Sequence, residues 1–451
     1  MKIIIVGCGK VGATLAEQLN NEGHDIIVID KDGGKLRALT DSLDVMGVEG
    51  NGAIYQIQMD AGIQDADLLI ATTNSDELNM LCCLIAKKAG DCHTIARIRN
   101  PEYSKEIPYI REELNLSMAM NPEMESAAEI SRLLKFPSAI KLDTFAKGRV
   151  ELMKYRIPEN SVLHDMQVFE VAPKLKCQVL ICAVERGHEV IIPGGSFRMQ
   201  AGDTISFVAA AKEAAAFFHK MDIAKTAIKS AMFVGGGKLT YYLAKLLEQT
   251  RIQIKIIEQD LARCNELSLL LPKAIIIHGD GSDQQLLLEE GLAQTEAFCA
   301  LTGFDEENIM LSLYAASVSK AKLVTKINRI AFEDVIQQLN LGSIIYPKLI
   351  AADAIVRYVR AMQNSMGSNV ETLYKIVANR VEALEFRVGK DAPMTGIPLE
   401  QLSLKDNLLV ACINRGGRII TPHGKDTIEP GDTVIVVTTH SGLNDLKDIL
   451  K

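Results

Sequence analysis

The chain has 451 residues, of which 48% are hydrophobic and 24% are charged, and it contains no tryptophan. This length suffices for roughly two to four domains of about 100–200 residues, and the composition is that of a globular protein rather than a disordered or fibrous one. The formal net charge of −8 argues against nucleic acid as a partner, because duplex binding depends on clustered Lys and Arg side chains.

Three further features bear on where the protein resides. The apolar run at the start of the chain ends at Gly7, which predicts a buried first strand rather than a signal peptide. No apolar run approaches the roughly 18–20 residues that cross a bilayer. The nine cysteines include no CxxC pair, a pattern typical of a reducing compartment. We therefore expect a cytoplasmic protein that is not integral to the membrane.

In chain order, the first part of the sequence alternates short β-branched runs with helical segments. Strands are predicted at 2–6, 25–29, 68–72 and 94–98, with helices at 11–21 and 77–89. This alternation predicts a doubly wound parallel sheet with helices on both faces. A further helix, at about 121–136, is expected to link this domain to the next.

A glycine-rich loop joins the first strand to the first helix. Gly7, Gly9 and Gly12 match the GxGxxG pattern, and Asp30 follows at the end of the second strand. The first glycine permits a tight turn, the second lets the backbone approach a phosphate, and the third allows the helix to pack on the strand. The helix N-terminus then favours the anion. A purely structural glycine turn is the alternative, but strand, helix and acid together favour a nucleotide site.

Asp30 predicts which nucleotide is bound. Its carboxylate is expected to accept the two ribose hydroxyls of the adenosine and to repel a 2′-phosphate, which favours NAD(H), ATP or ADP over NADP. The other predicted site residues lie in the glycine loop or at the carboxyl ends of later strands, where such sheets bind ligands. They are Cys8, Lys10, Val11, Asn51, Gly52, Thr73, Asn74, Arg97 and Arg99. A solvated position for Lys10, and an interface salt bridge for the two arginines, are the alternatives.

The segment that follows has a different pattern. From about 148 to 218, short alternating strands are separated by turns at Arg186-Gly187 and Gly202-Asp203. The two glycines stand where a tight turn needs a positive φ. This pattern predicts a small α+β domain.

The whole pattern is repeated in the second half of the chain. A second copy of the site is predicted from the aligned residues, which are Gly235, Gly237, Lys238, Glu258, Asp280, Gly281, Thr302, Gly303 and Lys326. The glycine motif and its acidic residue depart from the first copy: Thr240 replaces the third glycine, and Glu258, one methylene longer, replaces Asp30. A threonine at a close contact between helix and strand is expected to spread the packing and to weaken or alter the second site.

Several motifs give the chain a resemblance to a known family. Residues 3–12 (IIIVGCGKVG), 74–80 (NSDELNM) and 96–103 (ARIRNPEY), with a domain order that occurs twice, resemble the TrkA family of regulatory proteins of Trk-type potassium uptake systems, built from tandem RCK domains. The resemblance implies a Rossmann domain that binds NAD(H) or ATP/ADP and a C-terminal domain that binds a further effector. It also implies a homo-oligomeric ring, expected to be a tetramer, on the inner face of a membrane potassium-translocating subunit.

The expected fold class is therefore α/β, with two Rossmann-like doubly wound parallel-sheet domains, each followed by a small α+β RCK C-terminal domain. The expected limits are 1–123 for the first Rossmann domain, 124–142 for a crossover helix, 143–227 for the first C-terminal domain, 228–348 for the second Rossmann domain, 349–370 for the second crossover helix, and 371–451 for the second C-terminal domain.

The predicted site contains no recognisable catalytic set. A dehydrogenase needs a proton-transfer group beside its hydride acceptor, usually a His with a carboxylate or a Tyr–Lys pair. The eight histidines do not match between the halves: His24, for example, aligns with Ile252. We therefore expect a nucleotide-sensing regulatory subunit with no catalytic residues and no metal site. An NAD-dependent oxidoreductase and a stand-alone soluble nucleotide sensor are the alternatives.

Overall fold

The computed structural model describes residues 1–135, 139–145, 149–187, 189–221, 228–329, 333–336, 338–365, 370–376, 380–390, 392–440, 442–443 and 445–451. The chain divides into two compact units. The first contains Met1–Ser131, here called the first lobe, and Lys229–Val356, here called the second lobe. The second unit contains Arg132–Ile228 and Arg357–Lys451. Each unit therefore takes one part from each half of the sequence repeat.

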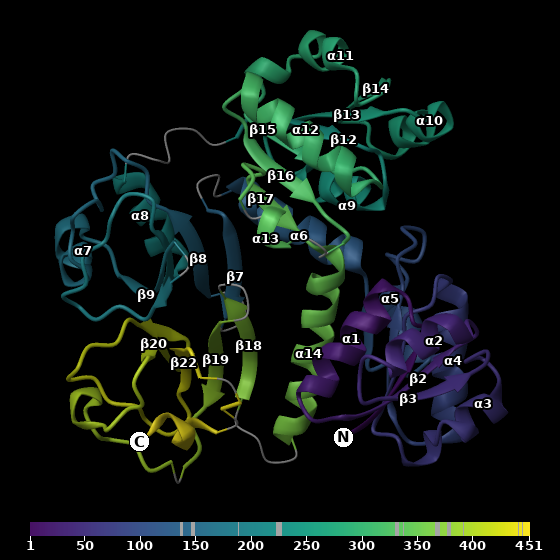
Figure 1. Ribbon diagram of the computed structural model, residues 1–451, viewed down its shortest axis with the longest axis horizontal. Helices are drawn as coiled ribbons and strands as arrows, with labels where there is room; N and C mark the ends of the chain where they lie inside the picture. The colour runs from purple at the N-terminus through teal and green to yellow at the C-terminus, as the bar shows by residue number, and fades with distance from the viewer. Residues whose placement is uncertain are drawn as a thin grey trace. The chain divides into compact units, whose positions relative to one another are not determined.

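The first lobe is built on a six-stranded parallel sheet (Figure 1). Its strands are β1 (Lys2–Val6), β2 (Asp25–Asp30), β3 (Met46–Glu49), β4 (Leu68–Ala71), β5 (His93–Arg97) and β6 (Met118–Met120), in the order β3-β2-β1-β4-β5-β6. The helices are α1 (Lys10–Asn21), α2 (Gly33–Thr40), α3 (Tyr55–Asp60), α4 (Asp76–Ala89), α5 (Ile107–Glu113) and α6 (Pro122–Lys135), the last of which extends beyond the lobe.

The second lobe repeats this arrangement. Its sheet has the order β14-β13-β12-β15-β16-β17, again with parallel pairing. The strands are β12 (Ser230–Val234), β13 (Gln253–Glu258), β14 (Ile275–His278), β15 (Ala297–Ala300), β16 (Lys322–Lys326) and β17 (Ser343–Ile345). The helices are α9 (Lys238–Leu247), α10 (Leu261–Leu270), α11 (Gln284–Glu289), α12 (Asp305–Val318), α13 (Glu333–Ile336) and α14 (Pro347–Ser365).

The central strands of both lobes are buried on both faces, which explains their uninterrupted apolar sequences. Ile3, Ile4 and Ile5 of β1 are fully buried, and β12 is likewise buried from Ala231 onward. Helices must cover both faces of such a sheet, and α1 packs on one of them with an apolar stripe that includes Leu15. The strand order 3-2-1-4-5-6 reverses direction between the first and fourth strands, and ligands of such sheets bind at the carboxyl ends of the strands at this point.

The second unit contains two five-stranded antiparallel sheets. The first has the order β10-β9-β11-β8-β7, with β7 (Lys141–Phe145), β8 (Val150–Arg156), β9 (Val179–Arg186), β10 (Glu189–Ile191) and β11 (Thr204–Ala210), and with the helices α7 (Val168–Leu175) and α8 (Ala211–Lys220). The second has the order β18-β19-β22-β20-β21, with β18 (Val370–Ile376), β19 (Val381–Arg387), β20 (Leu408–Arg415), β21 (Arg418–Ile420) and β22 (Thr433–Thr438).

The two antiparallel sheets share a hydrophobic core. Phe145, Leu152 and Val208 of the first sheet pack in one cluster with Val381 and Ile435 of the second. The predicted fold class is thus confirmed: two parallel-sheet Rossmann-like domains, each followed in the chain by a small sheet domain. The six-segment division of the chain stays a prediction. Within the described ranges, no helix combines the length and the hydrophobicity that a membrane-spanning segment requires.

Candidate functional site

The three glycines of the first loop occupy three different environments. Gly7 has φ +106°, which a residue with a Cβ rarely adopts. A Cβ added to Gly12 would lie only 1.9 Å from the carbonyl oxygen of Gly7, so α1 packs too closely on the loop for any side chain. A Cβ on Gly9 would meet no atom within 4 Å. The space beside Gly9 is therefore open toward the crevice, as a site for a phosphate requires.

Gly9 is also the N-cap of α1, with φ −68°, and it has no side chain to cap the helix. The N–H groups of the first turn and the helix dipole are therefore available to an anion. Lys10, at the start of this turn, is exposed, whereas Val11 is buried against the sheet. The structure thus places Lys10 on the solvent side of the loop.

Asp30 ends β2 directly beside the glycine loop. Its Oδ2 accepts a hydrogen bond from the backbone N–H of Cys8 at 2.5 Å, and its Oδ1 accepts one from Asp32 at 2.9 Å. Each carboxylate oxygen has a second lone pair, so the group can also accept ribose hydroxyls. Burial, together with the nearby carboxylates of Asp30 and Asp32, raises the pKa of the Cys8 thiol to about 11. Cys8 is accordingly a neutral thiol at neutral pH.

The loop after β4 is held in place by an asparagine. Asn79 of α4 is fully buried, and its Oδ1 accepts from both the N–H and the hydroxyl of Thr73 at 2.7 Å. Its Nδ2 donates to the carbonyl of Arg97 at 2.9 Å. Asn79 thereby ties the end of β4 to the end of β5 at the carboxyl edge. Thr73 and Asn74, both predicted site residues, are positioned by this tie.

The loop after β3 is similarly constrained. A Cβ on Gly52 would lie 2.3 Å from Cγ1 of Val6, so only glycine fits against β1 at this point. The carbonyl of Gly52 accepts from Nε2 of Gln58 at 2.7 Å, and Asn51 accepts from the N–H of Ala53 at 3.0 Å. Asn51 and Gly52 therefore lie at the carboxyl edge, on the β3 side of the glycine loop.

Arg97 and Arg99 supply positive charge at the same edge. Arg97 is 7% exposed and donates to the carbonyl of Thr73, and burial together with the neighbouring Arg99 lowers its pKa to about 10. Arg99 donates to the carbonyl of Asn74 at 3.2 Å and lies 3.6 Å from the carboxylate of Glu123. Both guanidinium groups therefore lie at the carboxyl edge, where they can interact with an anion as well as with the nearby carboxylate of Glu123.

Sequence reasoning did not assign site roles to Asp76, Asn79 and Glu123. Asp76 accepts from the N–H groups of Arg99 and Asn100 at 2.8 and 2.7 Å and so fixes the loop after β5. The repeat could have identified two of them as site residues, because Asp76 and Asn79 align with Asp305 and Asn308 in the second half. Glu123 had no such signal.

The second lobe reproduces this framework. Glu258 accepts from the N–H of Gly236 at 2.6 Å and from that of Asp260 at 2.8 Å, as Asp30 does in the first lobe. Asn308 accepts from the N–H of Thr302 at 2.9 Å and donates to the carbonyl of Lys326 at 2.9 Å. The remaining predicted residues occupy matching places. In the second glycine loop, Gly235 has φ +99°, Gly237 is the N-cap of α9 with open space around an added Cβ, and Lys238 is exposed. At the carboxyl ends of the later strands, Lys326 donates to the carbonyl of Thr302, Gly281 packs on Val234, Asp280 accepts from Ser282, and an added Cβ on Gly303 would also meet open space.

Thr240 and Arg263 distinguish the second site from the first. Thr240 is fully buried, and its hydroxyl donates to the carbonyl of Gly235 at 2.5 Å. A hydrogen bond therefore joins α9 to the second glycine loop, at the position where Gly12 of the first lobe has no side chain. Arg263, on α10, donates to the carbonyl of Gly236 at 2.7 Å and pairs with Glu266 at 2.6 Å. An arginine therefore lies over the second glycine loop.

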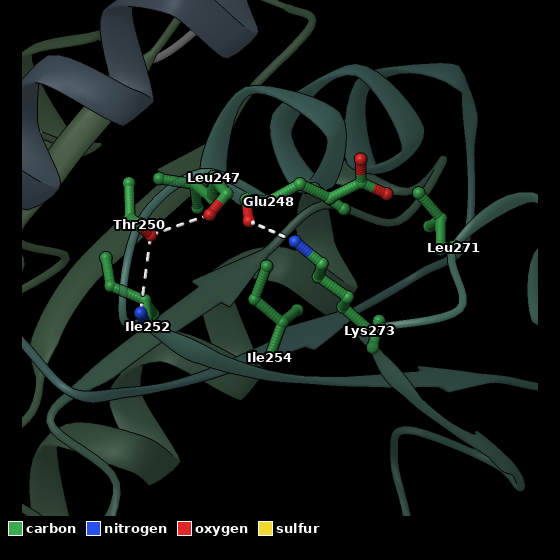
Figure 2. A pocket seen from close by; sticks show the side chains of 9 residues that line it. Leu247, Glu248, Thr250, Ile252, Ile254, Leu271 and Lys273 are labelled. Atoms are coloured by element: carbon green, nitrogen blue, oxygen red, sulfur yellow. Dashed lines mark hydrogen bonds between the residues drawn. The ribbon is translucent and has the colours of Figure 1, made fainter.

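A pocket in the second lobe lies away from this edge. Figure 2 shows its lining, in which Lys273 donates to the carbonyl of Glu248 at 3.1 Å and Thr250 donates to that of Leu247 at 2.7 Å. Leu247 ends α9 and Ile254 lies at the start of β13, so the pocket opens at the amino edge of the sheet. It is not part of the crevice at the carboxyl edge.

Family models match most of the chain. The model described as the TrkA-N domain matches residues 3–121 and 231–347, and the model described as the TrkA-C domain matches residues 152–222 and 383–451. These matches coincide with the two sheet types of the structure.

Solved structures with a similar fold include two of GsuK. The GsuK channel bound to NAD has a TM-score of 0.62 at 15% sequence identity, covering 97% of this chain and 76% of that chain. The GsuK RCK domain has a TM-score of 0.63 at 15% identity, covering 97% of this chain and 92% of that chain. These likenesses establish an RCK-type fold.

Sequence relatives extend over nearly the whole chain. The chain is 32% identical over 442 residues to the Trk system potassium uptake protein TrkA of Haemophilus influenzae, covering 97% of this chain and 95% of the relative. It is 31% identical over 439 residues to the protein of the same name from Halomonas elongata, with the same coverage. The chain therefore belongs to the TrkA family, as its sequence motifs predict.

Proposed function

We propose that the chain is a regulatory subunit of a Trk-type potassium uptake system and that a nucleotide bound at the first glycine loop biases the gate of the membrane potassium-translocating subunit. The observation that carries the proposal is the first crevice: an uncapped helix N-terminus, open space at Gly9, and two arginines at one sheet edge. Family membership supports the transport role. A nucleotide acts on the gate only through its different affinities for two states of the assembly.

The proposed ligands are NAD(H), ATP or ADP. Asp30 favours a free ribose over the 2′-phosphate of NADP, because a second negative charge would lie beside a carboxylate that already accepts two backbone N–H groups. The second site, altered by Thr240 and Arg263, is proposed as the weaker one. The proposed partner is the membrane subunit, with the chain in a homo-oligomeric ring, a tetramer, on the cytoplasmic face of the membrane.

We further propose that the chain is not an enzyme, on the ground that its first site has no histidine placed for proton transfer. The first lobe contains two histidines, His24 and His93, which lie immediately before β2 and at the first residue of β5. Both positions are at the amino edge, across the sheet from the crevice. A histidine at that edge is too far from a nicotinamide at the carboxyl edge to act as its proton-transfer group. Turnover of NADH by the purified chain with a reducible substrate would favour the oxidoreductase alternative.

The decisive test is the substitution Gly9→Asp. At φ −68°, with open space around the new Cβ, aspartate fits without strain, and an aspartate N-cap favours the helix. Its charge, however, stands where the phosphate would bind, and two charges about 4 Å apart near a protein surface repel by about 4 kcal/mol. We expect Gly9→Asp to weaken NAD⁺ or ATP binding by about a hundredfold or more in calorimetric titration. It should also remove the nucleotide response of potassium uptake with the membrane subunit.

The matched control is Gly9→Asn, which has the same size and no charge. We expect it to bind nucleotide within about tenfold of the wild type, because asparagine is also a favourable N-cap and repels no phosphate. Wild-type binding and wild-type regulation in Gly9→Asp would contradict the proposal.

A further inference from the structure

A direct contact connects the two glycine-loop sites, and it comes from Tyr242. This residue lies on α9, the helix that begins at the second glycine loop, yet its hydroxyl donates to the main-chain carbonyl of Arg99 in the first lobe at 3.0 Å. Tyr242 is 2% exposed, and burial raises its pKa to about 12, so the hydroxyl keeps its proton at neutral pH. Both lobes belong to the same compact unit.

Both ends of this contact belong to elements that form a site. On one side, Gly237 is the N-cap of α9, and Tyr242 lies just over one helical turn farther along the same rigid helix. On the other side, the guanidinium of Arg99 donates to the carbonyl of Asn74, while its backbone N–H is held by Asp76 at 2.8 Å. Tyr242 is therefore hydrogen-bonded to the main chain of Arg99, the side chain of which supplies positive charge to the first crevice.

Two further charged neighbours connect the lobes at the same place. Lys238, the first residue of α9, lies close enough to Glu77 of the first lobe to help lower the pKa of that carboxyl to about 2, after the hydrogen bonds from Ser75, the backbone and Tyr103. In the other direction, Lys10 of the first loop lies near Lys326 of the second lobe. Burial lowers the pKa of Lys326, and the positive charge of Lys10 lowers it further. Lys238 and Lys10 thus each lie near a charged side chain of the other lobe.

The tyrosine link has no counterpart at the equivalent position of the first lobe. In the first lobe, the residue that aligns with Tyr242 is Thr14, whose hydroxyl donates to the carbonyl of Lys10 in its own helix at 2.9 Å. The contact therefore carries a change at the second loop to the first crevice through one side chain. A single substitution can remove it.

We propose that Tyr242 is a positioning residue that couples the two nucleotide sites of one chain, so that a nucleotide at the second loop raises the affinity of the first. A nucleotide bound at the first turn of α9 restrains the helix, and Tyr242 then restrains the segment that contains Arg99. The first site consequently loses less conformational entropy when Arg99 is ordered by a phosphate. This inference rests on the proposed nucleotide-binding function.

The experiment closes the second site and measures the first in the full-length chain. Gly237→Asp is the closing variant, because Gly237 has φ −68° and open space, like Gly9. The probe is NAD⁺, with ATP in parallel, titrated calorimetrically. We expect Gly237→Asp to weaken the first site about fivefold or more, the lower range of measured couplings between sites. In a Tyr242→Phe background, the same closing substitution should change the first-site affinity less than about twofold.

Two controls keep the result specific. Tyr241→Phe removes the hydroxyl of the adjacent tyrosine, whose ring packs edge-on to Tyr242 at 5.4 Å, and it should leave the coupling as in the wild type. Because coupling is reciprocal, Gly9→Asp should weaken the second site by the same factor. Thermal melts of each variant check that the fold is retained.

Each outcome separates this inference from the proposed function. If the first site binds nucleotide equally tightly in the wild type and in Gly237→Asp, the coupling is overturned. The proposed function is not affected by that result. Coupling that persists in Tyr242→Phe overturns the role of Tyr242. Absence of nucleotide binding to the wild-type chain overturns the proposed function and this inference with it.

Discussion

Gly9 and Gly12 lie three positions apart, at the N-cap and in the first turn of α1, yet they tolerate a side chain to opposite degrees. At Gly9 an added Cβ has no neighbour within 4 Å, whereas at Gly12 it would lie 1.9 Å from the carbonyl oxygen of Gly7. A glycine pattern in the sequence does not show which glycine leaves open space and which one is required for close packing. The position with open space and the position that packs the helix become distinct only in the structure.

This difference predicts the effect of alanine at the two positions. We expect Gly12→Ala to destabilise the chain by about 1–3 kcal/mol, because helix α1 must move away from a backbone oxygen, and to weaken nucleotide binding with it. Gly9→Ala should change the free energy of unfolding by less than about 0.5 kcal/mol. Urea denaturation of both variants measures this, and a Gly12→Ala variant as stable as the wild type would refute the packing explanation.

At the scale of secondary-structure elements, an arginine and an aspartate join two turns in each small sheet domain. Arg186, at the end of β9, donates from Nε and Nη2 to the two carboxylate oxygens of Asp203 at 2.8 Å, and Asp203 is 2% exposed. Arg415 and Asp432 form the same pair in the second copy. The sequence showed that Arg-Gly and Gly-Asp recur together, but not that their side chains meet.

We expect Arg186→Met to cost about 2–4 kcal/mol of stability, because it leaves the buried carboxylate of Asp203 without its charge partner. Arg186→Lys should not restore stability, since lysine cannot make the two-pronged contact. The control is Arg198→Met, which removes a pair with Asp165 in which both side chains are more than half exposed, and which should cost less than about 1 kcal/mol. Equal losses in the two Met variants, measured by urea denaturation, would contradict this account.

The elements missed by sequence reasoning share a physical cause. β3 and β6 are short edge strands, and most of β3 is exposed, so neither carries the apolar run that identifies a central strand. β1, by contrast, is buried on both faces, and its limits were predicted correctly.

At the scale of the whole molecule, the chain order and the spatial grouping differ. The two Rossmann-like lobes are separated in sequence by a complete small domain, yet they form one unit, and the two small domains form the other with a shared core. Both proposed nucleotide sites therefore belong to a single unit.

This grouping predicts where a nucleotide stabilises the chain. A ligand that binds only the folded state slows local opening of the segments it contacts. We expect saturating NAD⁺ to increase hydrogen-exchange protection most around Gly7–Gly12 and Thr73–Asn79 of the first lobe. The same measurement on Gly9→Asp should show no increase there. Protection concentrated in residues 152–222 instead would place the ligand in the second unit.

The α/β class, the duplication and the position of the glycine loop could be predicted from the amino-acid sequence, because alternating apolar runs, an internal repeat and a loop between strand and helix are visible in the order of residues alone. The sequence also led to the family that the comparisons confirmed. The tertiary structure decided the rest: that Asn79 ties two strand ends together, that Thr240 is accommodated by a hydrogen bond, and that Tyr242 reaches Arg99 in the other lobe. Such contacts join residues far apart in the chain, so no local pattern encodes them.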